Sequence, residues 1–221
     1  MCMNKIIYHG SSSIVRNPKF GSGRAYNDFG SGFYCSDSIS HAAEWAVGSS
    51  SNGFVTAYSL DCNGLRIIDL CSPQYNLMHW LYLLLVFREF DPSTYLHAAK
   101  EYISKEFAVD YQACDCISGY RADNCSYALA ADFLNNTLSY ETLRSIIAND
   151  DMGRQFVLKS NRAFDRILYT GYDTSHSSRH YPEKVARELR YIKAAQNEAA
   201  SGLYISQMIE EGIKSYDTRL R

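Results

Sequence analysis

The sequence predicts an α+β fold, in which strands and helices follow one another without regular alternation. Seven short stretches of the 221-residue chain have the apolar and aromatic content of strands and are bounded by turn residues. Longer stretches repeat apolar residues every three to four positions, as helices do. The helical stretches differ widely in length and we find no internal repeat, which argues against a doubly wound sheet.

The first predicted strand is a short apolar run that ends at His9-Gly10. A loop rich in Ser, Gly and Asn follows up to Gly30, and an aromatic strand comes next. Asn63-Gly64 separates the third and fourth strands, and because this dipeptide is typical of hairpins, we expect a turn that joins them. The expected strands are 5–8, 32–35, 54–60, 65–69, 114–118, 155–159 and 166–172.

Ser36 or Asp37 is a suitable cap for the first predicted helix, and Pro73 suits the first turn of the second. The apolar run 77–87 in that second helix is too short to span a bilayer, which needs about 20 residues. The expected helices are 38–47, 73–90, 94–107, 126–134, 139–148 and a helical segment from Pro182 to Arg221. In that last segment a stripe is expected to pack on another surface: Val185, Leu189, Ile192 and Met208.

The composition is that of a globular protein, with 46% hydrophobic and 21% charged residues, which excludes disordered and collagen-like classes. The seven cysteines form no CxxC pair, and no histidines at metal-ligand spacing accompany them, so we expect no metal site. Free thiols and the lack of a signal-peptide pattern predict a cytoplasmic protein with no membrane association. The net charge is −2, but residues 154–193 carry +5, either as a solvated helix face or as a path for a phosphate backbone.

Two short segments could form a binding site. At His9-Gly10, glycine would let a ligand approach the backbone closely and histidine offers a ring donor or acceptor, although for this segment alone an ordinary strand exit is the simpler explanation. Tyr34 and Trp45 fall on a strand and on the helix that follows it. Because those elements must pack, the two rings either face each other across a slot for a planar ligand or form a core pair.

In combination, these segments resemble a known family. His9-Gly10-Ser11, residues 29–34 (Phe-Gly-Ser-Gly-Phe-Tyr), and Ser40 with Trp45 resemble the signature of the ADP-ribosyltransferase fold, in particular an H-Y-Q variant of its poly(ADP-ribose)-polymerase-like branch. With Asp28, residues 122–123 and residues 155–157 added, the chain is similar to a bacterial family of unknown function placed in that fold. The likeness runs from about residue 5 to 172. It implies a split mixed sheet in an NAD-binding domain, 1–178, followed by a helical extension, 179–221.

The resemblance also implies an activity and residue roles. The activity is that of a mono-ADP-ribosyltransferase, which cleaves NAD, releases nicotinamide and transfers ADP-ribose to a protein or nucleic acid. The implied setting is a bacterial toxin or defence effector, with an antitoxin-like partner or self-association through the C-terminal helices. His9 would bind the adenosine ribose, Gly10 the carboxamide, and Tyr34 and Trp45 the two faces of the nicotinamide. Ser11 and Arg24 are candidates for ribose and phosphate contacts.

Gln155 departs from the branch, which usually carries Glu at the matching catalytic position. An amide can donate or accept a hydrogen bond but supplies neither charge nor a general base. Mono-transfer, slow NAD hydrolysis and NAD binding alone therefore all remain open, and the alternative function is a catalytically silent NAD or ADP-ribose module acting through a partner. Under the transferase hypothesis, Gln155→Glu is expected to retain or increase NAD cleavage. Ala42 is a second departure, because a carboxamide-binding Ser is usual there.

Asp115 or Asp123 could accept the proton of the acceptor group, or else form an Arg–carboxylate pair in a capped loop. A third hypothesis, a cysteine hydrolase built on Cys114 or Cys116, has no local signature.

Overall fold

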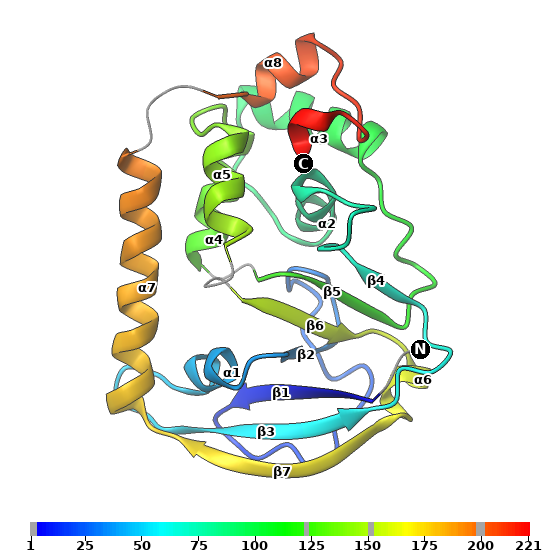
Figure 1. Ribbon diagram of the computed structural model, residues 1–221, viewed down its shortest axis with the longest axis vertical. Helices are drawn as coiled ribbons and strands as arrows, with labels where there is room; N and C mark the ends of the chain where they lie inside the picture. The colour runs from blue at the N-terminus through cyan, green and yellow to red at the C-terminus, as the bar shows by residue number, and fades with distance from the viewer. Residues whose placement is uncertain (1–3, 122–123, 150–152, 198–201) are drawn as a thin grey trace.

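A computed structural model describes residues 4–121, 124–149, 153–197 and 202–221. The fold is α+β, as the sequence predicts, and contains a mixed seven-stranded sheet with helices packed around it (Figure 1). All seven predicted strands are present. They are β1 (Lys5–Ser11), β2 (Phe33–Ser36), β3 (Gly53–Leu60), β4 (Ile67–Asp69), β5 (Cys116–Tyr120), β6 (Arg154–Leu158) and β7 (Ile167–Ser175).

The strand order is β4-β5-β6-β2-β1-β3-β7, and every neighbouring pair is antiparallel except β4 and β5. The expected turn at Asn63-Gly64 is present, with the N–H of Leu65 donating to the carbonyl of Cys62 at 3.1 Å. The prediction that this turn joins β3 and β4 in a hairpin is nevertheless wrong. β1 and β7 already pair with both edges of β3, so the chain continues past the turn and β4 pairs with β5 at the opposite edge of the sheet.

The helices follow the predicted order, with starts set by their caps. Ser38 rather than Ser36 or Asp37 caps α1, because its hydroxyl accepts from the N–H of His41. α2 begins four residues after Pro73, where Asn76 and His79 form a capping box. The described helices are α1 (Ile39–Ala46), α2 (Leu77–Phe87), α3 (Thr94–Glu106), α4 (Asn124–Leu134), α5 (Tyr140–Ile147), α6 (Asn161–Phe164), α7 (Ser177–Asn197) and α8 (Ile205–Glu210). Within the described ranges, no helix combines the length and apolar character needed to cross a membrane.

Apolar cores lie on both faces of the sheet. Adjacent strand residues point to opposite faces, and Phe156 and Val157 belong to different cores. The larger core lies where α2 to α5 and α8 pack around β4, β5 and β6 (Figure 1). The smaller core contains Ile7, Tyr58 and other side chains of the central strands.

α1 packs directly onto the backbones of β1 and β3. A Cβ at Gly10 would lie 1.8 Å from the carbonyl oxygen of Ala42, and one at Gly53 would lie 1.9 Å from that of Ala46. Both positions therefore require glycine for helix packing. This close approach places Trp45, near the end of α1, beside the end of β1.

The C-terminal segment packs on the rest of the protein, but the predicted stripe is wrong for two of its members. Leu189 and Ile192 are 51% and 44% exposed, whereas Tyr191 is buried in the larger core. α7 turns that face inward because Arg187, one turn before Tyr191, pairs with Glu44 of α1. The helix also begins at Ser177, before Pro182, where Asn52 Oδ1 accepts from its first N–H at 2.9 Å.

Met208 of α8 is buried in the larger core, as predicted for the stripe. Leu203, Ile205, Ile213 and Leu220 join it there. The predicted boundary at 178/179 thus falls in the first turn of α7, and the residues that follow it share a core with those that precede it.

Candidate functional site

The sheet opens between β1 and β2. These strands pair only where Tyr8 lies opposite Ser36, whereas β1 pairs with β3 along seven residues. Beyond Tyr8 the two strands border a cavity of about 780 Å³, within the range of roughly 300–1,000 Å³ typical of ligand sites. His9 Nδ1 and the Tyr34 carbonyl oxygen, 2.7 Å apart, bridge the opening.

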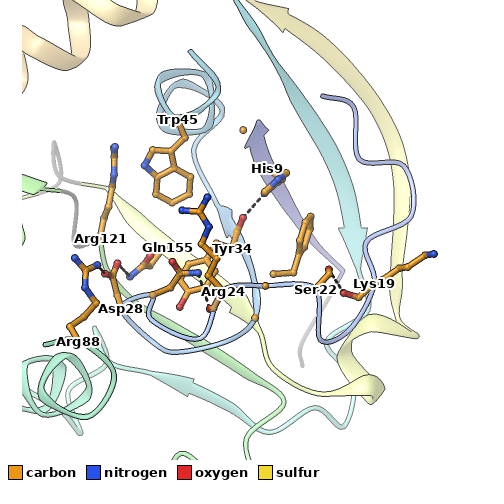
Figure 2. Close-up of a pocket in the computed structure, with 15 residues that line it drawn as sticks. His9, Lys19, Ser22, Arg24, Asp28, Tyr34, Trp45, Arg88, Arg121 and Gln155 are labelled. Atoms are coloured by element: carbon orange, nitrogen blue, oxygen red, sulfur yellow. Dashed lines mark hydrogen bonds and ion pairs between the residues drawn. The ribbon is translucent and has the colours of Figure 1, made fainter. Parts of the chain in front are cut away.

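Six residues predicted for the site line this cavity together. They come from β1, the loop 12–32, β2, α1 and β6, and Figure 2 displays their arrangement. The six are His9, Gly10, Arg24, Tyr34, Trp45 and Gln155.

Other predicted residues do not line the cavity. The hydroxyl of Ser11 donates to the carbonyl of Ser13 at 2.6 Å, so this side chain closes a local turn. Ala42 is fully buried against Gly10. Asp123 lies outside the described residues.

His9 is fixed as a neutral hydrogen-bond acceptor. Because a carbonyl oxygen only accepts, Nδ1 must carry the proton that it shares with Tyr34 O. Burial lowers the pKa of His9, and the hydrogen bond to Tyr34 only partly opposes that effect. The imidazole is therefore uncharged near neutral pH, and Nε2 can accept a hydrogen bond from a hydroxyl.

Tyr34 is anchored at its hydroxyl group. That hydroxyl donates to the carbonyl of Gly30 at 2.7 Å and accepts from the N–H of Phe29 at 2.9 Å. Burial raises the pKa of the phenol, so it stays protonated. These bonds tie the end of the loop 12–32 to β2 and hold the tyrosine ring at the cavity wall.

Trp45 belongs to α1 and lies across the cavity from β2. The guanidinium of Arg121 stacks over its ring, 4.8 Å from the ring centroid. Arg121 is also 3.5 Å from Glu44 Oε2, the atom that Arg187 of α7 binds. The described aromatic pairs include none between Tyr34 and Trp45, and both side chains are only partly buried. The structure therefore does not support a core pair, and both side chains face the cavity (Figure 2).

Gln155 is 2% exposed and is held by two acceptors. Its Nε2 donates to Asp28 Oδ2 at 3.2 Å and to the carbonyl of Tyr120 at 3.1 Å. Asp28 in turn accepts from Arg88 Nη1 at 2.7 Å through its other oxygen. The only carboxylate among the described lining residues is thus paired with a cation.

The cavity is electropositive. Four described lining residues are cationic, Lys19, Arg24, Arg88 and Arg121, against the single carboxylate of Asp28. Such a lining suits an anion of the phosphate class. Sequence reasoning assigned a role only to Arg24. Asp28 stands directly before the Phe-Gly motif, which is a usable signal, whereas Arg88 comes from a segment without any motif.

Comparison with known proteins assigns a family. Residues 5–169 match the model of a protein family described as a protein of unknown function, DUF3990. The chain belongs to this family. No curated protein and no solved structure matches the chain. Every described residue that lines the cavity falls inside the DUF3990 match, whereas α7 and α8 follow it.

In this DUF3990 member, Asp115 does not line the cavity, and its carboxylate is bound by neighbouring residues. Its carboxylate accepts from Ser160 Oγ at 2.6 Å and from the N–H of Arg66 at 2.8 Å, and Arg162 lies 3.8 Å away. Burial alone would raise the pKa of Asp115, but these two donors and the nearby arginine lower it. Asp115 is thus bound within its own neighbourhood, although its arginine partner is Arg162, whereas Arg121 lies beside Glu44, and Asp115 does not line the cavity.

The structure does not favour the cysteine hydrolase hypothesis. Cys114 and Cys116 are both buried and neither lines the cavity, and burial raises the pKa of both thiols. Within the described ranges, no three His, Cys, Asp or Glu side chains cluster in a way that could hold a metal ion.

Proposed function

We propose that this DUF3990 protein has an ADP-ribosyltransferase fold and binds NAD in the cavity between β1 and β2. One observation carries the proposal. His9, Gly10, Tyr34, Trp45 and Gln155 belong to motifs far apart in the sequence, yet they line one cavity at the opening of the sheet. Ordinary strand exits and core aromatics would have no reason to converge in this way.

The cavity lining matches the chemical parts of NAD. The rings of Tyr34 and Trp45 offer apolar faces to the planar nicotinamide. His9 Nε2 offers an acceptor to a ribose hydroxyl. Lys19 and Arg24, which have no described acidic partner, offer positive charge to the diphosphate.

The reaction proposed for this site is mono-ADP-ribosyl transfer. The bond between C1′ of the nicotinamide ribose and N1 of nicotinamide breaks, the electron pair stays on nicotinamide, and a nucleophile of the acceptor bonds to C1′ and releases its proton to solvent. Gln155 has no charge and cannot take that proton, so chain elongation is not part of the proposal. The acceptor is a macromolecule, protein or nucleic acid, in a toxin or defence setting.

A second candidate function is a silent NAD or ADP-ribose module that acts through a partner. Gln155 and the neutralising pair of Asp28 with Arg88 favour it, because neither presents an unpaired negative charge to a positively charged transition state. In this function the cavity would hold the nucleotide without cleaving it.

Nicotinamide release separates the two functions. The purified protein is incubated with NAD and free nicotinamide is followed by chromatography, while a cell lysate supplied with NAD and the protein is searched by mass spectrometry for ADP-ribosylated species. Under the transferase proposal, nicotinamide and modified acceptors both accumulate. Binding of NAD without nicotinamide release would support the silent module, and absence of binding would reject both functions.

A further inference from the structure

The amide of Gln155 has one orientation that satisfies its neighbours. Asp28 Oδ2 and the carbonyl oxygen of Tyr120 are both acceptors, so both must face Nε2, whose two hydrogens they use. Oε1 makes no hydrogen bond to any described residue, and the side chain lines the cavity. The atom that Gln155 presents to a ligand is therefore an acceptor.

Both partners of Gln155 are themselves held in place. Asp28 is buried, and its second oxygen accepts from Arg88 at 2.7 Å. The carbonyl of Tyr120 also accepts from the indole N–H of Trp80, a fully buried residue of α2, at 3.0 Å. Gln155 thus faces a pair of acceptors fixed by other elements, and its amide cannot turn over without placing Oε1 against two oxygens.

We propose that Asp28 is the positioning residue of this site: it holds Gln155 so that Oε1 faces a hydroxyl group of the ligand. The negative charge of the site belongs to position 28 and not to position 155. The identity of the hydroxyl, a ribose of NAD, rests on the proposed function, whereas the orientation of the amide does not.

This arrangement changes the expectation for Gln155→Glu. A carboxylate at position 155 would have no proton to donate and would lie against Asp28 Oδ2 and the Tyr120 carbonyl. Repulsion between the two carboxylates disfavours the folded protein at neutral pH and eases when one of them is protonated. We therefore expect the single substitution to be harmful rather than activating.

Moving the carboxylate from position 28 to position 155 should restore the stability that Gln155→Glu alone loses. In the double variant Asp28→Asn/Gln155→Glu, the new amide at position 28 can accept from Arg88 with its oxygen and donate to the carboxylate at position 155 with its nitrogen. The carboxylate presents an acceptor to the cavity whichever way it turns. Asp28→Asn alone leaves the Tyr120 carbonyl as the one neighbour that requires Nε2, so the orientation of the Gln155 amide is held less strongly.

The test is a double-mutant cycle measured by denaturant unfolding at pH 7.5 and pH 5, with exposed Gln74→Glu as the matched control. Gln155→Glu should raise the unfolding equilibrium constant at least about 10-fold at pH 7.5, and less at pH 5, because it breaks a hydrogen bond to a charged group. Asp28→Asn should restore most of that loss in the double variant. Equal stability of Gln155→Glu and wild type at pH 7.5, or no restoration in the double variant, would overturn the proposal.

NAD affinity is the second measurement, because it would not change if Asp28 only stabilised the fold. We expect Asp28→Asn to weaken NAD binding about 5- to 10-fold in calorimetry, and the double variant to recover to within about threefold of wild type, since one hydrogen bond is worth about that factor. Unchanged affinity in Asp28→Asn, or no recovery in the double variant, would remove the ligand role of Asp28. If wild type binds no NAD, the proposed function fails, and the unfolding cycle alone then decides the orientation of Gln155.

Discussion

At the residue scale, His9 links folding to pH. Burial lowers its pKa, so between the usual histidine value of 6.5 and the lower folded value the unfolded chain binds more protons than the folded one. Stability therefore falls as pH drops below 6.5 and through the folded pKa, and it is retained above 6.5.

The expected signature is a smaller acid-induced loss of stability in His9→Asn than in wild type. Unfolding free energies at pH 7.5 and pH 5.5 measure it for both proteins. His79 also has a pKa lowered by burial, but its contribution is common to both proteins and cancels in the comparison. Identical pH dependence in the two proteins would mean that His9 is not held neutral in the folded state.

Tyr34 combines two roles that substitutions can separate. Tyr34→Phe removes the hydrogen bonds to Gly30 and Phe29 but keeps the ring. We expect it to lose about 1–3 kcal/mol of unfolding free energy while NAD affinity changes little. Tyr34→Ala should lose NAD affinity as well, by about 1–3 kcal/mol, because the stacking area is gone. Equal NAD affinities for the Phe and Ala variants would exclude the ring from the ligand site.

The sequence predicted which residues line the cavity, but it did not predict the residues that hold them in place. His9, Gly10, Tyr34, Trp45 and Gln155 stand in motifs, and all five line the cavity. The contacts that orient them join distant segments, as Asp28 does with Gln155, and such pairs leave no local pattern. Ser11 shows the converse error: it stands in the motif, but its hydroxyl is used within its own loop.

At the element scale, α7 shows that an ion pair can decide which face of a helix is directed to the core. Its apolar residues alone suggested that Leu189 and Ile192 face inward, but both are exposed and Tyr191 is buried. The ion pair of Arg187 with Glu44 sets the inward face. A charged side chain on a polar helix is easily assigned to solvent from sequence, so this pairing could not be anticipated.

Substitutions on neighbouring positions of α7 test this orientation. Tyr191→Ala should lower the unfolding free energy by about 3–5 kcal/mol, as truncation of a buried aromatic side chain does. The control Leu189→Ser, two residues before Tyr191 and therefore on the opposite, exposed face, should change it by less than about 0.5 kcal/mol. Chemical denaturation measures both, and a larger loss for Leu189→Ser than for Tyr191→Ala would reverse the assigned faces. A change of oligomeric state in Leu189→Ser would support self-association through this helix.

Strand positions along the chain were predictable, and their order in the sheet was not. Runs such as Phe54–Leu60 have the apolar and aromatic content of a strand and are bounded by turn residues. Which strands pair depends on edges supplied by distant segments, which is why β4 lies beside β5 rather than β3. The opening between β1 and β2, on which the whole site depends, likewise has no signature in either strand alone.

At the scale of the whole molecule, the site joins the family-matched body to the C-terminal segment. Arg121 stacks on Trp45 and lies beside Glu44. Glu44 in turn binds Arg187, which lies outside the DUF3990 match. The cavity wall on the α1 side is thus supported by a helix outside the matched region. We propose that this cavity is an NAD site whose wall includes the indole ring of Trp45.

Calorimetric titration of NAD into the full chain measures whether NAD binds and whether Trp45 contributes to the binding. We expect one NAD site per chain, and a loss of about 1–3 kcal/mol of binding free energy in Trp45→Ala, equal to roughly 5- to 150-fold in Kd. Tyr216→Ala, which truncates a ring that is 75% exposed and does not line the cavity, is the control and should bind NAD as wild type does. No NAD binding by wild type, or equal affinity in a folded Trp45→Ala protein, would contradict the claim.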